Sequence, residues 1–393
     1  MKAVYCYDGP LYRDEEGFYY GRNFNDQMFE RYFKVVDSLE IIIRVREMKQ
    51  EDAIRSLSRI KNPNISVTEC PNLSSVKGLL TKTLEVYKLL KERISKADVV
   101  FVRVPSNISN IAIDVCKKLD KKYLIEVVGC QWDAYWNYSL KGKLFALPAT
   151  LMMKQRIKKA PYVLYVTNKF LQKRYPTNGK TINCSNVELA EMTNVVLDNR
   201  INRIKEYDTT TKYIIGTAAG IDVLFKGQEY IIRAIGALKE KGITCFEYWL
   251  VGGGTASRLM KIAEECHVTE QVKIMGQIPQ SKIYDWLDEI DIYAQPSRQE
   301  GLPRAVIEAM SRGVPCIGAK TAGIPELLEE DYVFSNSKTE VEEICNILMR
   351  MINDKTKLQD SSKRNYEEAK KYQRNTLIEK RTAFFKEFVD ENI

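Results

Sequence analysis

The chain has 393 residues, 45% of them apolar, and a formal net charge of +8. This length exceeds what a single core usually serves, so two domains are predicted, and no stretch has the apolar length of a transmembrane helix. The only histidine, His267, follows a helix-like run and is predicted to end that helix, which excludes histidine acid–base catalysis in the N-terminal half and a multi-histidine metal site. Nine cysteines without a Cys-x-x-Cys pair and an N-terminus without a signal-peptide pattern indicate a reduced, cytoplasmic protein.

Residues 1–206 are predicted to form a first α/β domain, because β-prone apolar runs alternate with helical patterns, as in a parallel sheet. The predicted strands cover 1–7, 39–45, 67–69, 98–104, 123–128, 161–167 and 181–184. The predicted helices cover 25–36, 47–59, 77–94 and 108–119. The polar segment 198–212 lacks strong periodicity, so the domain junction is placed at 206/207.

The segment 141–180 is strongly basic and leaves two interpretations open. It contains ten lysines and arginines and no aspartate or glutamate, with Leu144, Phe145, Leu147, Leu151, Met152, Met153 and Ile157 interleaved. A basic amphipathic helix of this kind can lie on an anionic membrane surface. It can equally be a helix whose apolar side belongs to the core and whose lysines are solvated. No nucleic-acid recognition motif accompanies the charge, so nucleic acid is not an expected partner.

Residues 207–375 are predicted to form a second α/β domain. Its predicted strands cover 212–216, 245–251, 272–275, 290–294 and 314–319. Its predicted helices cover 228–241, 259–266, 283–287, 305–310, 340–352 and 357–372. The last segment, 376–393, is predicted to be a helix that carries Phe384, Phe385 and Phe388.

The most informative stretch is 295–310, a polar loop between a predicted strand and a predicted helix. In an open α/β sheet such a loop lies outside the carboxyl end of its strand, where ligands bind. It presents Glu300 in the loop and Glu308 in the helix, and the helix N-terminus favours an anion. Read without a ligand, Glu300 would cap the helix and Glu308 would be a solvated helix residue.

This stretch resembles the retaining family-4 glycosyltransferases of GT-B fold. The similarity rests on the frame Pro-Ser-x-x-Glu-Gly-Leu-Pro…Glu-Ala-Met-x-x-Gly-Val-Pro-Cys-Ile and on the continuation Ala-Gly-Ile-Pro-Glu-Leu at 322–327. About forty contiguous residues match in register. The resemblance implies two Rossmann-like domains facing a cleft, with the final helix crossing back onto the first domain.

The family's donor-site roles carry over to matching positions of the second domain. The resemblance implies that Lys226, in Phe-Lys-Gly-Gln, supplies a cation to the donor diphosphate and that Glu300 contacts the transferred sugar. Glu308 would bind the ribose hydroxyls, and the backbone of 301–303 would lie against sugar and phosphate. The remaining implied donor contacts are Gly301, Leu302, Pro303, the glycine turn at Gly252 and Gly253, and the base-binding turn at Met275 and Ile278.

One position departs from the family pattern. The usual arginine after the preceding strand's glycine is missing, because Gly216 is followed by Thr-Ala-Ala-Gly. Arg304 is the candidate for a substitute cation, with helix N–H groups as the alternative. No Asp-x-Asp pair occurs anywhere in the chain, as expected for a site that needs no metal ion or other cofactor.

The first domain is expected to hold the acceptor. Gly129, Trp132 and Asp133 follow the predicted strand 123–128, where the chain becomes aromatic and polar, as sugar-binding surfaces often are. The family's histidine is absent from this region, and Asp133 is the nearest titratable replacement. An aromatic core loop would explain the same residues.

The resemblance implies a metal-independent, retaining hexosyltransferase that uses a nucleotide diphosphate sugar. Its acceptor would be a glycan, lipid-linked in one version, in the assembly of capsule, O-antigen lipopolysaccharide or exopolysaccharide, and the protein would be cytoplasmic or peripheral on the inner face of the cell membrane. Two alternatives stay open: a catalytically inactive nucleotide-sugar-binding partner, for which the missing arginine is the motive, and a GT-B sugar-nucleotide epimerase.

Overall fold

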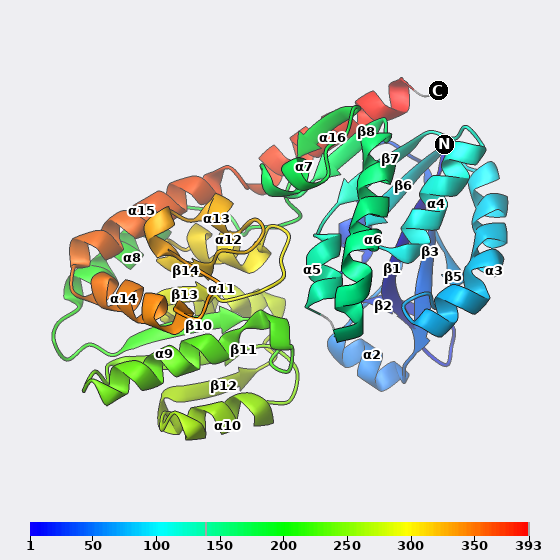
Figure 1. Ribbon diagram of the computed structural model, residues 1–393. Helices are drawn as coiled ribbons and strands as arrows, with labels where there is room; N and C mark the ends of the chain where they lie inside the picture. The colour runs from blue at the N-terminus through cyan, green and yellow to red at the C-terminus, as the bar shows by residue number, and fades with distance from the viewer. Residues whose placement is uncertain (138–139, 392–393) are drawn as a thin grey trace. The chain divides into compact units, whose positions relative to one another are not determined.

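The computed structural model describes residues 1–137 and 140–391, and its internal contacts divide the chain into two compact units. The N-terminal unit comprises Met1–Gln131, Leu147–Cys184 and the chain from Leu377 onward. The C-terminal unit comprises Trp132–Ala146 and Ser185–Thr376. Each unit is built around its own sheet, in agreement with the two predicted α/β domains (Figure 1).

The N-terminal sheet is mostly parallel, in the order β5-β3-β1-β6-β7-β8-β9. A short antiparallel extension, β2 and β4, is added where the long strand β1 passes the end of the parallel core. The strands are β1 (Lys2–Arg13), β2 (Tyr19–Gly21), β3 (Ser38–Glu47), β4 (Ser58–Arg59), β5 (Ile65–Cys70), β6 (Val99–Val104), β7 (Tyr123–Val127), β8 (Tyr162–Tyr165) and β9 (Lys180–Asn183). β7 and β8 are buried over their whole length, as expected for strands covered on both faces.

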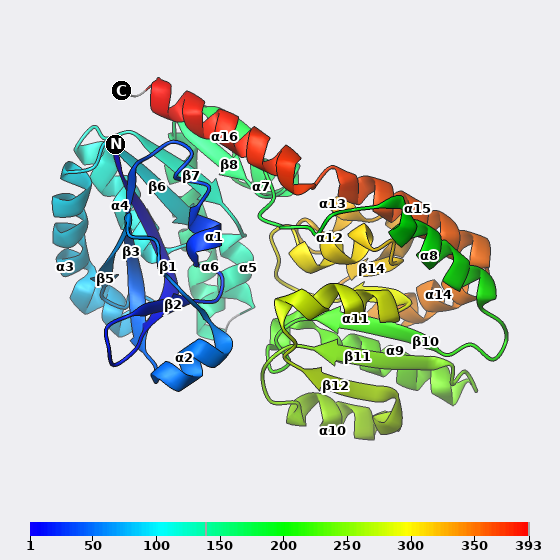
Figure 2. The ribbon, with the colours of Figure 1, turned by 180° about the vertical axis from the view of Figure 1, so that it is seen from behind.

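Helices lie on both faces of the N-terminal sheet (Figure 1, Figure 2). They are α1 (Asp26–Phe29), α2 (Gln50–Ser56), α3 (Val76–Ser95), α4 (Asn107–Lys118), α7 (Phe170–Arg174) and, from Leu147 onward, α6 (Leu140–Lys158). The segment 132–146, with most of α5 (Gln131–Trp136) and the first turns of α6, is grouped with the C-terminal unit. The C-terminal helix α16 (Arg374–Asp390) also packs on the N-terminal unit. Its Phe385 stacks on Tyr32 with ring centroids 5.6 Å apart and contacts Phe101 of β6 at 5.1 Å. Buried aromatic contacts therefore join the end of the chain to its first third.

The C-terminal sheet is entirely parallel, in the order β12-β11-β10-β13-β14-β15. The chain starts in the middle, at β10, moves outward to β12 and then returns to build the other half from β13. This is the strand order of a doubly wound Rossmann sheet. The strands are β10 (Tyr213–Ala218), β11 (Phe246–Val251), β12 (Val272–Gly276), β13 (Ile292–Gln295), β14 (Cys316–Ala319) and β15 (Val333–Phe334).

Two groups of helices cover the two faces of this sheet. α9 (Gln228–Glu240), α10 (Ser257–Glu265) and α14 (Glu340–Ile352) form one group, seen in front in Figure 1. α8 (Asn194–Glu206), α11 (Ile283–Glu289), α12 (Arg304–Ser311) and α15 (Lys355–Lys370) form the other, seen in front in Figure 2. The short elements are α13 (Ile324–Leu327), η1 (Leu224–Lys226), η2 (Thr269–Gln271), η3 (Gln280–Lys282) and η4 (Glu330–Tyr332).

The division between the units differs from the junction placed at 206/207. The contacts divide the chain at Cys184/Ser185, so α8 belongs to the C-terminal unit. Its Arg200 is 4% exposed and donates to the carbonyl oxygens of Ile290 at 2.6 Å and Leu287 at 2.8 Å. The polar sequence of 198–212 places residues up to 206 in the first domain, but the buried arginine that caps the end of α11 attaches α8 to the C-terminal unit.

Other local differences are smaller. The predicted helix 25–36 is reduced to the four residues of α1, because Phe24, Phe29 and Tyr32 form an aromatic cluster that the chain reaches through turns. His267 ends α10 with a left-handed φ of 56°, as expected for a helix-end residue. Among the described residues, no helix is long and apolar enough to cross a membrane.

Candidate functional site

The strand order of the C-terminal sheet places its switch point between β10 and β13. These two parallel strands are adjacent, and the helices that follow them, α9 and α12, lie on opposite faces of the sheet. The loops that leave the carboxyl ends of β10 and β13 meet at this point, which is the usual ligand site of such sheets. The first loop leads to Lys226, and the second contains Glu300.

Glu300 is held by a short hydrogen-bonded chain that starts inside the sheet. Tyr293 of β13 is fully buried, and its hydroxyl donates to Oε1 of Gln295 at 3.0 Å. Nε2 of Gln295 donates to Oε1 of Glu300 at 2.9 Å and to Oγ of Ser297 at 2.8 Å. Because Gln295 is itself only 3% exposed, this series of hydrogen bonds fixes the direction of the Glu300 carboxylate.

Lys226, in the loop after β10, forms an ion pair with the Glu300 carboxylate. Its Nζ is 2.6 Å from Oε1 of Glu300, and the two side chains are 23% and 13% exposed. The next residue, Gly227, has a φ of 71°, and a Cβ there would lie 2.1 Å from the carbonyl oxygen of Pro296. Glycine is therefore required for the two loops to approach this closely, and it keeps Lys226 beside Glu300.

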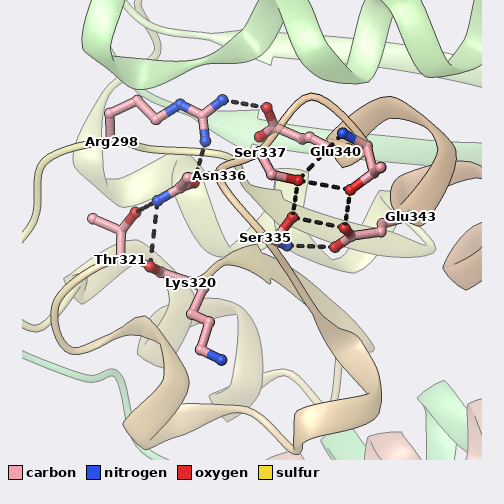
Figure 3. Close-up of polar contacts among 9 residues, drawn as sticks. Arg298, Lys320, Thr321, Ser335, Asn336, Ser337, Glu340 and Glu343 are labelled. Carbon is pink, nitrogen blue, oxygen red and sulfur yellow. Dashed lines mark hydrogen bonds and ion pairs between the residues drawn. The ribbon is translucent and has the colours of Figure 1, made fainter.

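Arg298 attaches the loop between β13 and α12 to helix α14 (Figure 3). Its guanidinium donates to Glu340 of α14 and to Asn336, and it lies 4.2 Å from the ring centroid of Tyr230. Asn336 in turn donates to Oγ1 of Thr321 at 2.8 Å. The Glu340 side chain is only 2% exposed, so this ion pair is buried at its acidic end.

The backbone of Arg298 adds a second attachment. Its N–H donates to the carbonyl oxygen of Phe225 at 2.7 Å, directly beside Lys226. The loop between β13 and α12 is thus fixed to the Lys226 loop by its backbone and to α14 by its side chain. These attachments hold the loop in one conformation, and a preorganised charged site needs its groups held in this way.

A glycine turn after β11 closes against the loop that leaves β10. Gly252 has a φ of 155°, and a Cβ there would lie 1.8 Å from the carbonyl oxygen of Ala219. Gly254 has a φ of 119°, and a Cβ there would lie 2.3 Å from Oδ1 of Asp222. The N–H of Ile221 donates to the carbonyl oxygen of Gly253 at 2.9 Å. The fold of this turn therefore requires glycine at Gly252 and Gly254, whether or not the turn also contacts a pyrophosphate.

Glu308 lies on the second turn of α12, one turn after Arg304. Burial raises the pKa of its carboxyl group, and the charge of Arg304 partly opposes that shift. Within the described part of the chain, no hydrogen bond is made by the Glu308 carboxylate. A carboxylate in a desolvated position without a donor is unfavourable, and hydroxyl groups of a ligand would relieve this.

The other residues predicted to contact the donor differ in their burial and in their hydrogen bonds. Leu302 is 7% exposed, and Gly301 accepts from the N–H of Gly323 at 2.9 Å, so this part of the loop is fixed by packing and backbone. Pro303 occupies the N-cap position of α12. Met275 is 42% exposed at the end of β12, whereas Ile278 is partly buried in the following turn.

The predicted acceptor residues lie around the start of α5. Gly129 belongs to the N-terminal unit, whereas Trp132 and Asp133 are grouped with the C-terminal unit. Trp132 stacks on Trp136 with ring centroids 5.0 Å apart, an aromatic pair on consecutive turns of one helix. Trp136 is 42% exposed, so this aromatic pair forms part of the surface.

Sequence reasoning missed Gln295, Arg298 and Glu340. Gln295 and Arg298 are inside the motif, but their roles depend on partners that spacing does not reveal, namely the carboxylate of Glu300 and an acid on a later helix. No cluster of His, Cys, Asp and Glu able to hold a metal ion was found among the described residues.

Known proteins are similar to this chain in sequence and in fold. The family model described as glycosyl transferases group 1 matches residues 200–372. Protein CapJ of Staphylococcus aureus is 31% identical over 337 residues, which are 85% of this chain and 82% of CapJ. The chain belongs to the group 1 glycosyltransferases.

Two further similarities extend this result. The amylovoran biosynthesis glycosyltransferase AmsK of Erwinia amylovora is 38% identical over 113 residues, 27% of this chain and 28% of AmsK. The crystal structure of Anabaena HepE in complex with UDP superposes with a TM-score of 0.64 over 97% of this chain and 98% of HepE, at 14% identity. The fold is therefore GT-B, with two Rossmann-like domains, and the chain is related to enzymes of polysaccharide biosynthesis.

Proposed function

We propose that this glycosyltransferase transfers a hexose, with retention of anomeric configuration, from a nucleotide diphosphate sugar to a glycan acceptor. The observation that carries the proposal is the meeting of Lys226, Glu300 and Gln295 at the carboxyl ends of β10 and β13. UDP-sugars are the first donors to test, because the structurally similar HepE binds UDP.

In the proposed reaction, Lys226 faces the diphosphate and stabilises the negative charge that develops as the bond between C1 and the phosphate oxygen breaks. The acceptor oxygen attacks C1 from the same face, and its proton passes to the departing phosphate oxygen, so the nucleoside diphosphate leaves with it. Glu300 holds hydroxyl groups of the transferred sugar, and Glu308 holds those of the ribose. No step requires a protein base or a metal ion.

Arg304 is proposed to replace the arginine that the loop after β10 lacks. It is exposed on the first turn of α12, where the helix N-terminus also favours a phosphate. The expected effect of Arg304→Ala is weaker donor binding and slower turnover. Unchanged donor affinity and turnover would contradict this assignment.

The acceptor is proposed to be a growing, lipid-linked glycan of a capsule, O-antigen or exopolysaccharide, bound through Gly129, Trp132 and Asp133 at the cytoplasmic face of the membrane. The relationship to CapJ and AmsK supports the polysaccharide context. The missing arginine favours one competing proposal, an inactive partner that binds a nucleotide sugar without transferring it.

The test is transfer from α-linked nucleotide sugars to glycan acceptors, with the anomeric configuration of the product read by NMR. The proposal predicts an α-linked product and activity that survives EDTA. A β-linked product would overturn retention, and loss of activity with EDTA would overturn metal independence. Donor binding without release of nucleotide in any acceptor screen would favour the inactive partner.

A further inference from the structure

Helix α6 has two long faces, and both are apolar. The inner row, Ala146, Thr150, Met153 and Ile157, is at most 4% exposed and belongs to the core. The outer row, defined as Leu144, Leu147, Leu151, Lys154 and Lys158, follows the same spacing of three and four residues, about 100° around the helix from the inner row. A helix of a globular protein needs one apolar face for its core, so the second face requires another explanation.

The outer face is exposed to an unusual degree. The exposed fractions are 77% for Leu144, 56% for Leu147 and 48% for Leu151, while the flanking Phe145 and Met152 are each 52% exposed. These are five of the twelve exposed large hydrophobic residues among the described part of the chain, and they fall within nine consecutive positions. Scattered exposed apolar residues are normal, but a contiguous group marks an interaction surface.

The same face becomes basic toward the end of the helix. Lys154, Lys158 and Lys159 are exposed, and none forms an ion pair with a described carboxylate. Arg156, which lies between them, is already paired with Asp114 of α4 at 2.7 Å. Burial lowers the pKa of the neighbouring Lys117; the charge of Asp114 opposes this shift, and the charges of Arg156 and Lys159 add to it.

We infer that the outer face of α6, formed by the outer row together with Phe145, Met152 and Lys159, lies on an anionic lipid leaflet. Its apolar half would enter the boundary between headgroups and acyl chains, and its lysines would contact the lipid phosphates. Segment 141–180 contains no carboxylate to oppose this attraction. A second copy of the chain is a poorer occupant, because pairing this face with itself would bring like charges together.

This inference rests on the proposed function only for its purpose, which is to bring the site to a lipid-linked acceptor. The test uses the full chain without donor or acceptor, so a failure to bind membranes leaves nucleotide-sugar binding untouched. Co-sedimentation is measured with phosphatidylcholine vesicles and with vesicles containing 30% phosphatidylglycerol, a fraction chosen on the order of a bacterial-type anionic leaflet. The measurement is repeated at low and high salt.

The wild-type chain is expected to bind the anionic vesicles at low salt and to bind neutral ones weakly. Each lysine near an anionic surface contributes roughly a fivefold factor in affinity, so K154Q/K158Q/K159Q should bind about a hundredfold more weakly and lose most of the salt dependence. L147Q/L151Q/M152Q should also weaken binding at least about tenfold.

The matched control is I54Q on α2, where the isoleucine is 64% exposed and has Glu51 one turn before it instead of a basic row. This variant should bind vesicles like wild type, and all variants should keep the wild-type melting temperature. Failure of the wild-type chain to bind anionic vesicles at low salt would overturn the inference. It would also be overturned if the leucine variant of α6 bound like its control, or if the outer face proved to be the contact of a dimer that this variant dissolves.

Discussion

Replacing Arg298 by leucine should destabilise the C-terminal unit far more than the loss of one surface ion pair would. Arg298 donates to Glu340, whose side chain is 2% exposed, and the substitution leaves that carboxylate buried without its cation. Breaking a buried pair on one side costs about 3–5 kcal/mol. The matched surface pair is Lys282 and Asp285, which are 66% and 63% exposed, so Lys282→Leu should cost less than about 1 kcal/mol.

Urea unfolding followed by tryptophan fluorescence measures this difference, because all four tryptophans lie in the ranges of the C-terminal unit. For a unit of this size the expected loss lowers the melting temperature by roughly 6–20 °C. The double variant Arg298→Leu/Glu340→Leu should recover much of the stability, because removing both charges leaves no buried ion.

The loss should also depend on pH in a defined direction. Burial raises the pKa of Glu340, and Arg298 is the main group that opposes the shift, so the pKa rises further in Arg298→Leu. A carboxyl group with a raised pKa in the folded state becomes less destabilising as the pH falls through that pKa. The variant should therefore be closer to wild type at pH 5 than at pH 8. A midpoint equal to that of Lys282→Leu, or a double variant no more stable than the single one, would refute the reasoning.

Three further predictions concern the donor site. Glu308→Gln should weaken nucleotide-sugar binding roughly 10–150-fold, as expected for hydrogen bonds to a charged acceptor. Because burial raises the pKa of Glu308, wild-type affinity measured by calorimetry should fall as the pH drops through that pKa, whereas the variant should show no such fall. Lys226→Ala should lower kcat about 10²–10³-fold with a smaller change in donor affinity, and Lys226→Arg should restore part of the rate; equal losses in kcat and affinity would contradict the role proposed for it. Gly252→Ala should cost more than about 3 kcal/mol in urea unfolding, because the new Cβ would meet the carbonyl oxygen of Ala219, whereas Gly242→Ala, with φ 81° and open space, should cost about 1 kcal/mol. Similar losses for the two glycines would show that the close contact is relieved.

The sequence predicted the motif region well because its signals are local. The strand before the loop and the helix after it appear as β13 (Ile292–Gln295) and α12 (Arg304–Ser311). Apolar periodicity and a proline at the helix start are sufficient for such an assignment. The meeting of Lys226 and Glu300 was not visible in spacing, since 74 residues separate them, and the family resemblance implied only that both belong to the donor site.

Features that depend on tertiary contacts were predicted less well. The polar helix α8 was assigned to the first domain, although Arg200 attaches it to the second through hydrogen bonds to carbonyl groups that a sequence pattern cannot show. The role of Arg298 depends on Glu340, 42 residues later and on the opposite face of the sheet. For segment 141–180 the sequence left two interpretations open, and the structure shows that α6 has both a buried and an exposed apolar face.

The central claim is that the C-terminal unit binds a nucleotide sugar through the site formed by Lys226, Glu300 and Glu308. Thermal denaturation of the wild-type chain and of Glu308→Gln, with UDP-, GDP-, ADP- and dTDP-sugars, tests it most directly. A ligand at about a hundredfold its dissociation constant stabilises by roughly 2.7 kcal/mol, which corresponds to several degrees. We predict that one base raises the wild-type melting temperature by this amount and leaves the variant almost unchanged. No shift with any nucleotide sugar, or the same shift in both proteins, would contradict the claim.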